Sequence, residues 1–211
     1  MTAILFDLDG TLLNTLDDLA DAVNRTLAYF GCPARTREEV RRFVGNGAER
    51  LIRLALPGKA DDPDVLAVLD HFKRDYAANS QVKTCPYAGV LEALALVKAE
   101  FPVAIVSNKP DGAVKLLCSQ YFGDVYALGE SSACPRKPAP DMVKKAMAAI
   151  GADHCIYVGD SEVDVLTAKN AGVPCLSVLW GFRDRQTLVE AGADHFCDHP
   201  SQLLNSLKEM I

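Results

Sequence analysis

The sequence predicts an α/β fold in which a three-layer parallel sheet carries a small all-helical domain inserted after its first strand. Short apolar runs of strand length alternate with stretches of helical periodicity, the pattern of a parallel sheet wrapped by helices. The apolar residues of each run are consecutive, as in strands covered on both faces. Residues 7–102 separate the first run from the second, far more than one helical crossover needs.

The expected strands follow these apolar runs along the chain. They are residues 3–6, 103–106, 125–128, 155–158 and 175–179, with a short edge strand at 195–197. Each run has the length and the flanking turn residues that are typical of a buried strand.

The long interval after the first strand is predicted to be helical throughout. One apolar face comprises Leu16, Leu19, Ala20, Val23, Leu27 and Phe30, and a second stripe comprises Val65, Leu66, Leu69, Phe72 and Tyr76. Gly31 and Pro33 are expected to end the first helix, and Thr36 with Glu39 forms a capping box for the next. We therefore expect an α/β core domain at 1–14 and 85–211 and a helical cap domain at 15–84.

Composition restricts the kind of partner. The chain has 211 residues, 49% of them hydrophobic, and a formal net charge of −6, which argues against a nucleic-acid or anionic-membrane surface. No apolar run is long enough for a membrane span, and no signal-peptide pattern opens the chain. These two features favour a cytoplasmic location. The seven cysteines are scattered without a C-x-x-C pair, so we expect reduced thiols. The expected oligomeric state is a monomer or a homodimer.

Polar residues follow several of the predicted strands. Asp7 and Asp9 come after the first run, residues 107–109 (Ser-Asn-Lys) after the second, and Asp160 and Asp164 after the fourth. In open α/β sheets, ligands bind outside the carboxyl ends of the strands. We therefore expect these side chains to converge on one edge of the sheet, where the prolines around Lys137 could direct its ammonium group.

Carboxylates, a hydroxyl and a lysine at one edge indicate a hard cation and a phosphate. Mg²⁺ prefers oxygen ligands and is commonly held by one or two carboxylates together with a substrate phosphate. Such a site also explains why two carboxylates stand one residue apart: Asp7 can face the metal and the phosphorus, whereas Asp9 can point toward the leaving group.

Four segments then identify a family resemblance. DLDGT at 7–11, VSN at 106–108, RKPAP at 136–140 and GDSEVD at 159–164 resemble, in this order, the four motifs of the haloacid dehalogenase superfamily. The resemblance covers the whole chain, including a helical cap after the first strand.

The resemblance implies roles for individual residues. Asp7 would be the nucleophile that forms an aspartyl-phosphate, and Asp9 the general acid and base. Thr11, Ser107, Asn108 and Lys137 would bind the substrate, and Asp7, Asp9 through its backbone carbonyl, and Asp160 would bind Mg²⁺. Asp164 would lie behind the metal ligands or coordinate through water.

Three further segments resemble one group within the superfamily and so indicate the class of substrate. The stretches VGNGAERLI at 44–52, VSNKP at 106–110 and VLWGF at 178–182 are similar to phosphoglycolate phosphatases, so a small acid phosphate is the expected substrate. Asn46 and Arg50 of the cap are the candidate contacts for its second anionic group. Asn14 and Ser107 depart from the residues common in that family, although Ser107 preserves the hydroxyl.

Several alternatives remain open. A carboxylate at Asp9 favours phosphoryl transfer to water over halide release, but a sugar-phosphate mutase or a phosphatase of nucleotides, sugar phosphates or pyrophosphate would share these motifs. A receiver domain also gathers aspartates, a hydroxyl and a lysine around Mg²⁺. Individually, Asp9 could belong to a simple turn and Lys137 could be a solvated lysine; Asp17, Asp18 and Asp21 are interpreted as ordinary acids at a helix start.

Overall fold

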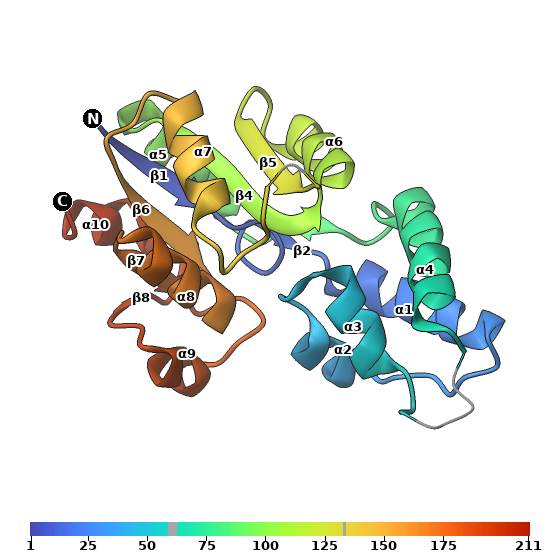
Figure 1. Ribbon diagram of the computed structural model, residues 1–211. Helices are drawn as coiled ribbons and strands as arrows, with labels where there is room; N and C mark the ends of the chain where they lie inside the picture. The colour runs from blue at the N-terminus through green and yellow to red at the C-terminus, as the bar shows by residue number, and fades with distance from the viewer. Residues whose placement is uncertain (59–62, 133) are drawn as a thin grey trace. The chain divides into compact units, whose positions relative to one another are not determined.

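The computed structural model describes residues 1–58, 63–132 and 134–211 (Figure 1). The chain divides into an α/β unit, Met1–Leu13 with Pro86–Ile211, and a helical unit, Asn14–Cys85. These limits lie one residue from the predicted domain boundaries. That the helical unit acts as a cap domain remains a prediction.

A six-stranded parallel sheet forms the centre of the α/β unit. Its strands are β1 (Thr2–Phe6), β4 (Val103–Pro110), β5 (Tyr126–Glu130), β6 (His154–Gly159), β7 (Cys175–Val178) and β8 (His195–Cys197). The order across the sheet is β5-β4-β1-β6-β7-β8, and each adjacent pair is parallel. The predicted fold class is confirmed.

The strand order creates a switch point at β1. The chain builds outward from β1 through β4 and β5 on one side, and through β6, β7 and β8 on the other. Residues that follow β1, β4 and β6 therefore meet at one edge of the sheet, where a doubly wound fold binds its ligands.

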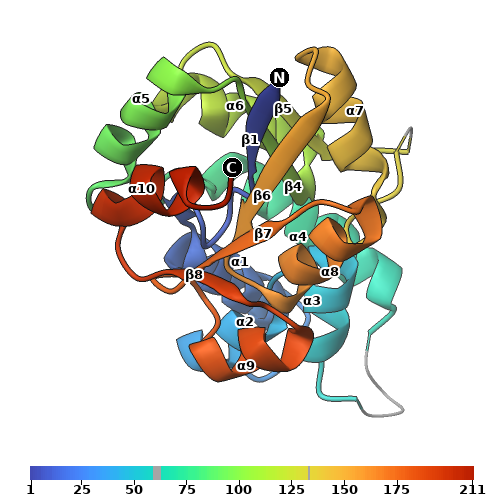
Figure 2. The same cartoon turned by 90° about the vertical axis from the view of Figure 1, so that its left-hand side faces the viewer.

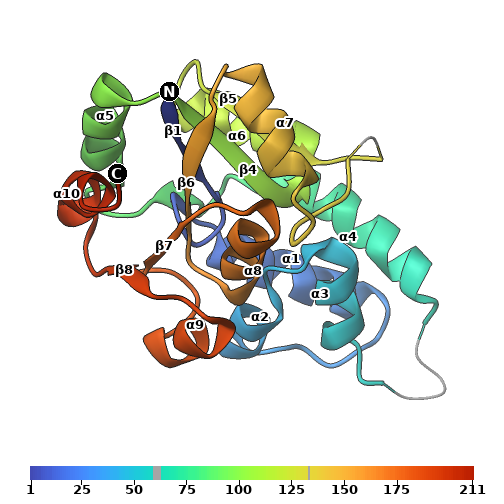
Figure 3. The same cartoon turned by 60° about the vertical axis from the view of Figure 1, so that its left-hand side comes forward.

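Helices cover both faces of the sheet. They are α5 (Val90–Glu100), α6 (Asp111–Tyr121), α7 (Asp141–Ala149), α8 (Glu162–Ala171), α9 (Arg185–Ala191) and α10 (Leu203–Lys208), with a 3₁₀ turn, η1, at Pro200–Gln202. Figures 2 and 3 show α5 and α10 on one side of the sheet and α7 and α8 on the other.

Alternate residues of β1 enter two separate hydrophobic cores. Ile4 and Phe6 pack in the core that includes residues of α5, α6 and α10, and Ala3 and Leu5 pack in the core that includes residues of α7, α8 and α9. All four side chains have no exposed surface. Burial on both faces explains why the strand is apolar at consecutive positions.

The second predicted strand is longer than its apolar run. β4 continues through Ser107, Asn108 and Lys109 to Pro110, and its pairing with β5 shifts register between Val106 and Pro110. The extension was not predicted, because hydrophobic patterning detects apolar residues only, and Ser107, Asn108 and Lys109 are polar although they are buried. Two short strands, β2 (Leu13–Asn14) and β3 (Cys85–Pro86), form a separate sheet and were also not predicted.

The helical unit contains α1 (Leu16–Tyr29), α2 (Arg37–Phe43), α3 (Gly47–Ala55) and α4 (Val65–Asn79). The capping box of Thr36 and Glu39 is confirmed. The predicted stripe on α4 is wrong at Leu66, which is 65% exposed, whereas Val68 is buried beside Leu69. A one-residue step turns a side chain by about 100°, so Leu66 falls outside the buried face.

The seven cysteines all lie in the described residues and form no disulfide bond, as predicted. Within residues 1–58, 63–132 and 134–211, the structure contains no helix long and apolar enough to cross a membrane.

Candidate active site

The loop after β1 carries the first predicted site residues. Parallel pairing continues one step past the strand, because the Asp7 amide donates to the Val158 carbonyl at 2.8 Å. The chain then turns at Gly10, whose φ of +89° is a left-handed conformation that favours glycine. Asp7 is therefore fixed at the sheet edge, while Asp9 lies in the turn beyond it.

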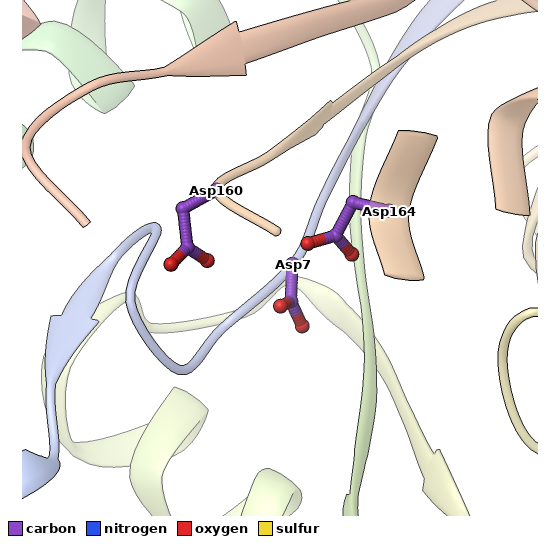
Figure 4. Close-up of side chains that lie close together, drawn as sticks. All are labelled: Asp7, Asp160 and Asp164. Atoms are coloured by element: carbon purple, nitrogen blue, oxygen red, sulfur yellow. The ribbon is translucent and has the colours of Figure 1, made fainter. Parts of the chain in front are cut away.

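Three buried aspartates meet at this edge (Figure 4). Asp7 follows β1, Asp160 follows β6, and Asp164 lies in the first turn of α8. One carboxylate oxygen from each lies within 4.8 Å of the others. The topology thus brings together residues that are about 150 positions apart in the sequence.

Lys137 lies between two of these carboxylates. Its Nζ is 2.8 Å from Asp7 Oδ1 and 2.8 Å from Asp164 Oδ1, and it donates to the Tyr157 hydroxyl at 3.0 Å. The Tyr157 hydroxyl in turn donates to the Val106 carbonyl at 3.2 Å. Lys137 is only 2% exposed, so it is not the solvated surface lysine of the alternative interpretation.

Asp164 is held by both of its oxygens. Oδ1 accepts from Lys137, and Oδ2 accepts from the Ser161 hydroxyl at 2.6 Å and the Ser161 amide at 3.1 Å. Asp164 has no exposed surface. These contacts indicate that Asp164 orients Lys137 and the start of α8. Its role toward a metal, behind the ligands or through water, stays a prediction.

Asp160 sits between two loops that both approach it closely. Its Oδ1 accepts from the Thr11 hydroxyl at 3.1 Å, and its Oδ2 accepts from the Phe182 amide at 2.7 Å. A Cβ on Gly181 would stand 2.3 Å from the Cβ of Asp160, and one on Gly10 would stand 2.3 Å from Asp160 Oδ2. Only glycine allows this approach, because no real Cβ contact is so short.

The charge balance of the cluster favours a cation. Burial and the nearby Asp164 carboxylate raise the pKa of Asp7 to about 7, although Lys137 acts in the opposite direction. Burial, followed by the charges of Asp164 and Asp7, raises the pKa of Asp160 as well. Burial alone would lower the pKa of Lys137, but Asp164 and Asp7 outweigh it and raise that pKa.

A divalent ion fits this donor set. Three carboxylates are buried around one ammonium group, and the raised pKa values of Asp7 and Asp160 reflect negative charge that the ammonium does not compensate. Within the described residues, Lys137 bonds one oxygen of Asp7 and leaves the other for a ligand. All the donors are oxygens, the preference of Mg²⁺ and of similarly hard cations.

Asp9 is paired with Lys109, whereas Asp7 is paired with Lys137. Lys109 Nζ donates to Asp9 Oδ1 at 2.9 Å and to Oδ2 at 3.0 Å. The Lys109 side chain is 2% exposed and that of Asp9 is 16% exposed. The two neighbouring carboxylates, Asp7 and Asp9, are therefore each paired with a separate lysine.

Ser107 and Asn108 also lie at the sheet edge and are buried. The Ser107 hydroxyl accepts from the Lys109 amide at 3.3 Å. Asn108 exchanges two hydrogen bonds with the backbone of Lys137, a contact that the sequence prediction of a substrate-binding role did not include.

The two predicted cap residues belong to the helical unit. Asn46 precedes α3 between Gly45 and Gly47, whose φ angles are +119° and +82°. Arg50 is exposed on α3. A substrate contact by either residue stays a prediction.

Lys109 was expected at this edge of the sheet but without a role, and three contributors to the site were missed: Tyr157, Gly181 and Phe182. Lys109 directly follows two predicted site residues, and Gly181 and Phe182 stand in a stretch that resembled phosphoglycolate phosphatases. Nothing in the sequence indicates that Tyr157 belongs to the site, because its position within an apolar run indicates only a buried strand residue. Its hydroxyl nevertheless accepts from Lys137.

Comparison with known proteins identifies the family. The profile of the haloacid dehalogenase-like hydrolases matches residues 4–178. The chain belongs to this family. The resemblance predicted from the four motifs is thereby confirmed.

Individual relatives within the family are similar over nearly the whole chain. A phosphoglycolate phosphatase of Pseudomonas syringae pv. tomato is 35% identical over 219 residues, 99% of this chain and 78% of the relative. Phosphoglycolate phosphatase 1 of Pseudomonas aeruginosa is 33% identical over 221 residues, with the same coverage. A crystal structure of a protein from Lactobacillus delbrueckii subsp. bulgaricus superposes with a TM-score of 0.89 at 33% identity, covering 97% of each chain. The prediction of a phosphatase is confirmed.

Proposed function

We propose that this haloacid dehalogenase-like hydrolase is a Mg²⁺-dependent phosphomonoesterase that works through an aspartyl-phosphate on Asp7 and acts on phosphoglycolate or a similar small acid phosphate. The observation that carries the proposal is the position of Lys137, whose ammonium is 2.8 Å from both Asp7 and Asp164. A carboxylate nucleophile beside a buried cation suits the attack on a phosphoryl group.

The first half-reaction transfers the phosphoryl group to the protein. An Asp7 oxygen attacks phosphorus and forms a P–O bond, while the bond between phosphorus and the ester oxygen breaks. Protonated Asp9 gives its proton to that leaving oxygen, so the alcohol departs neutral. Lys137 and the Ser107 hydroxyl hold the phosphoryl oxygens while charge moves among them.

The second half-reaction returns the protein to its starting state. Asp9, now a carboxylate, takes a proton from a water molecule whose oxygen attacks the phosphorus of phospho-Asp7. The bond between phosphorus and the Asp7 oxygen breaks, inorganic phosphate leaves, and Asp9 is again protonated. Atoms and protons balance over the two steps.

The metal belongs to the same proposal. Mg²⁺ would be held by the carboxylates of Asp7 and Asp160 and by the backbone carbonyl of Asp9, and would supply positive charge to the phosphoryl oxygens. Thr11 and the Phe182 amide keep Asp160 in place for this role. Asp164 keeps Lys137 in place.

The substrate class follows from the relatives. Proteins about 35% identical to this chain over 99% of its length carry the name phosphoglycolate phosphatase. Asn46 and Arg50 of the helical unit are the proposed contacts for the second anionic group of such a substrate. The absence of disulfide bonds among the seven described cysteines supports the proposed cytoplasmic location.

A substrate panel with a matched pair of variants tests the proposal. Phosphate release is measured with Mg²⁺ or with EDTA on phosphoglycolate, glucose 1-phosphate, a nucleoside monophosphate and pyrophosphate. We expect phosphoglycolate to react fastest, EDTA to stop the reaction, and Asp7→Asn to abolish it while the protein stays folded. Asp153→Asn, an exposed aspartate paired with the N-terminus, should behave like the wild type.

Each part of the proposal can fail separately. Substantial turnover by Asp7→Asn would show that Asp7 is not the nucleophile. Full activity in EDTA would contradict the proposed requirement for Mg²⁺. Isomerisation of glucose 1-phosphate without phosphate release from phosphoglycolate would replace the hydrolase with a mutase, and no reaction with any ester would remove the activity itself.

A further inference from the structure

We infer that Lys109 is a positioning residue that holds the carboxylate of Asp9 at the site of proton transfer. The inference rests on the proposed function, in which Asp9 exchanges a proton with the leaving oxygen and then with water. It assigns to Lys109 a task separate from that of Lys137, although both lysines lie at the same edge of the sheet.

Lys109 contacts both carboxylate oxygens of Asp9, and its side chain is buried. One ammonium group donates to both oxygens of Asp9, at 2.9 and 3.0 Å, which restricts rotation of the carboxylate more than a single hydrogen bond would. The Lys109 side chain is 2% exposed, and lysine is rarely buried to this degree unless it is paired. An ion pair removed from solvent is also screened much less than a surface pair.

The two partners differ in how firmly the backbone holds them. Lys109 lies in the last part of β4, between Val106 and Pro110, which both pair with β5. Asp9 lies outside β1, in the turn that Gly10 completes at a φ of +89°. A side chain on a strand can therefore fix a side chain on a loop, and precise placement of a catalytic group favours such support.

The irregular end of β4 explains how Lys109 reaches Asp9. The register between β4 and β5 shifts after Val106, and pairing resumes at Pro110. Within this interval the Lys109 amide donates to the Ser107 hydroxyl at 3.3 Å. Local irregularities of this kind redirect side chains next to active sites.

Separate cations also keep the two carboxylates in separate roles. Asp7 and Asp9 are one residue apart and repel each other when both are charged. Lys137 holds Asp7 near Asp160, and Lys109 holds Asp9. Removal of Lys109 should leave the Asp7 cluster in place and release the Asp9 side chain.

A double-mutant cycle tests whether Lys109 acts through Asp9. The proteins are the wild type, Lys109→Met, Lys109→Arg, Asp9→Asn and Lys109→Met with Asp9→Asn, assayed for kcat and KM on p-nitrophenyl phosphate and phenyl phosphate. We expect Lys109→Met to lower kcat about 10- to 100-fold with a larger loss on phenyl phosphate, the poorer leaving group, while KM changes less than about threefold. In the Asp9→Asn background, the same substitution should cost less than about twofold.

The controls separate positioning from a general loss of structure. Lys109→Arg keeps the charge and should recover most of kcat, which a role in packing alone would not predict. Lys115→Met removes another lysine–aspartate pair of the α/β unit, with Asp111 at 2.6 Å, and should leave kcat unchanged. An equal loss from Lys109→Met with and without Asp9→Asn would overturn the inference, because Lys109 would then act on the substrate or the fold directly.

A crystal structure of Lys109→Met gives a result that does not depend on activity. A displaced or mobile Asp9 carboxylate, with Asp7 and Lys137 unchanged, supports the inference. An Asp9 carboxylate in its wild-type place overturns it. If the wild type hydrolyses neither ester, the proposed function fails for these substrates, and the position of Asp9 still decides the inference.

Discussion

Asn108 and Lys137 are joined by two reciprocal hydrogen bonds. The side-chain amide of Asn108 donates to the Lys137 carbonyl at 3.0 Å, and the Lys137 amide donates to Asn108 Oδ1 at 2.8 Å. Both residues are buried. One side chain on β4 thus holds the segment that carries the buried ammonium group, so Asn108 can support catalysis without contacting the substrate.

We expect Asn108→Ala to loosen this segment and lower kcat about 100-fold, because Lys137 would no longer be fixed relative to Asp7. The substitution also leaves a buried amide and a buried carbonyl without this partner, at a cost of about 1 to 3 kcal/mol in the free energy of unfolding. Steady-state kinetics and denaturant unfolding measure the two effects.

Asn170→Ala is the matched control. Asn170 donates to the Pro138 carbonyl at 2.9 Å, so it binds the same segment, but its hydrogen bond is exposed. We expect a change in kcat below about threefold, because water can replace an exposed partner. Equal losses in both variants would mean that any contact with this segment matters and that Asn108 has no special place.

Gly181→Ala should weaken metal binding. The added Cβ would stand 2.3 Å from the Asp160 Cβ and 2.5 Å from the Gly10 carbonyl, so Asp160 or the loop after β7 must move. We expect the Mg²⁺ concentration for half-maximal activity to rise about 10- to 100-fold. Gly112→Ala, on α6 with nothing within 4 Å of its Cβ position, should leave that concentration unchanged, and a shift of the same size there would remove the steric explanation.

The metal-free protein should lose stability as pH rises, and Mg²⁺ should restore it. The pKa of Asp7 is raised from 3.8 to about 7 in the folded state, so the folded state binds a proton more tightly than the unfolded state does. The resulting stabilisation is complete below pH 3.8 and is lost as pH rises through 7. The raised pKa of Asp160 acts in the same direction.

Thermal unfolding at about pH 5 and about pH 8, each in EDTA and in Mg²⁺, tests whether the metal-free protein loses stability as pH rises. We expect the increase in Tm caused by Mg²⁺ to be larger at the higher pH, where the carboxylates no longer carry protons that compete with the ion. Asp160→Asn should reduce the increase at both pH values. An equal or larger increase at the lower pH would contradict the assignment of these aspartates to the metal.

The sequence predicted the sheet better than it predicted the contacts of the site. Buried strands such as β1 and β6 leave a strong signal, because hydrophobic burial on both faces requires consecutive apolar residues. The convergence of Asp7 and Asp160 followed from topology, and the place of Lys137 was predicted from the prolines around it. Pairings between side chains did not, because hydrogen-bond partners such as Asn108 with Lys137 depend on distances that no periodicity encodes.

Asp18 illustrates the same limit in the helical unit. It was interpreted as an ordinary acid at a helix start, but it is only 2% exposed. Its carboxylate accepts from the Lys83 amide at 3.0 Å on both oxygens and from the Thr84 amide at 2.8 Å. The available signal was its position, since Asp18, Ala22 and Thr26 follow one another at intervals of four and are all buried on α1.

Asp18→Ala should therefore destabilise the helical unit. The carboxylate ties the start of α1 to the chain at Lys83 and Thr84, and its removal leaves two backbone amides without this charged acceptor, at a cost of about 3 kcal/mol. Asp21→Ala is the matched control, because Asp21 contacts the same Lys83 through its exposed ammonium group at 2.6 Å, a surface pair worth less than about 1 kcal/mol. Hydrogen exchange at the Lys83 and Thr84 amides separates the two variants: exchange should accelerate in Asp18→Ala and stay near the wild-type rate in Asp21→Ala. Equal protection in both would mean that the buried carboxylate does not hold this segment.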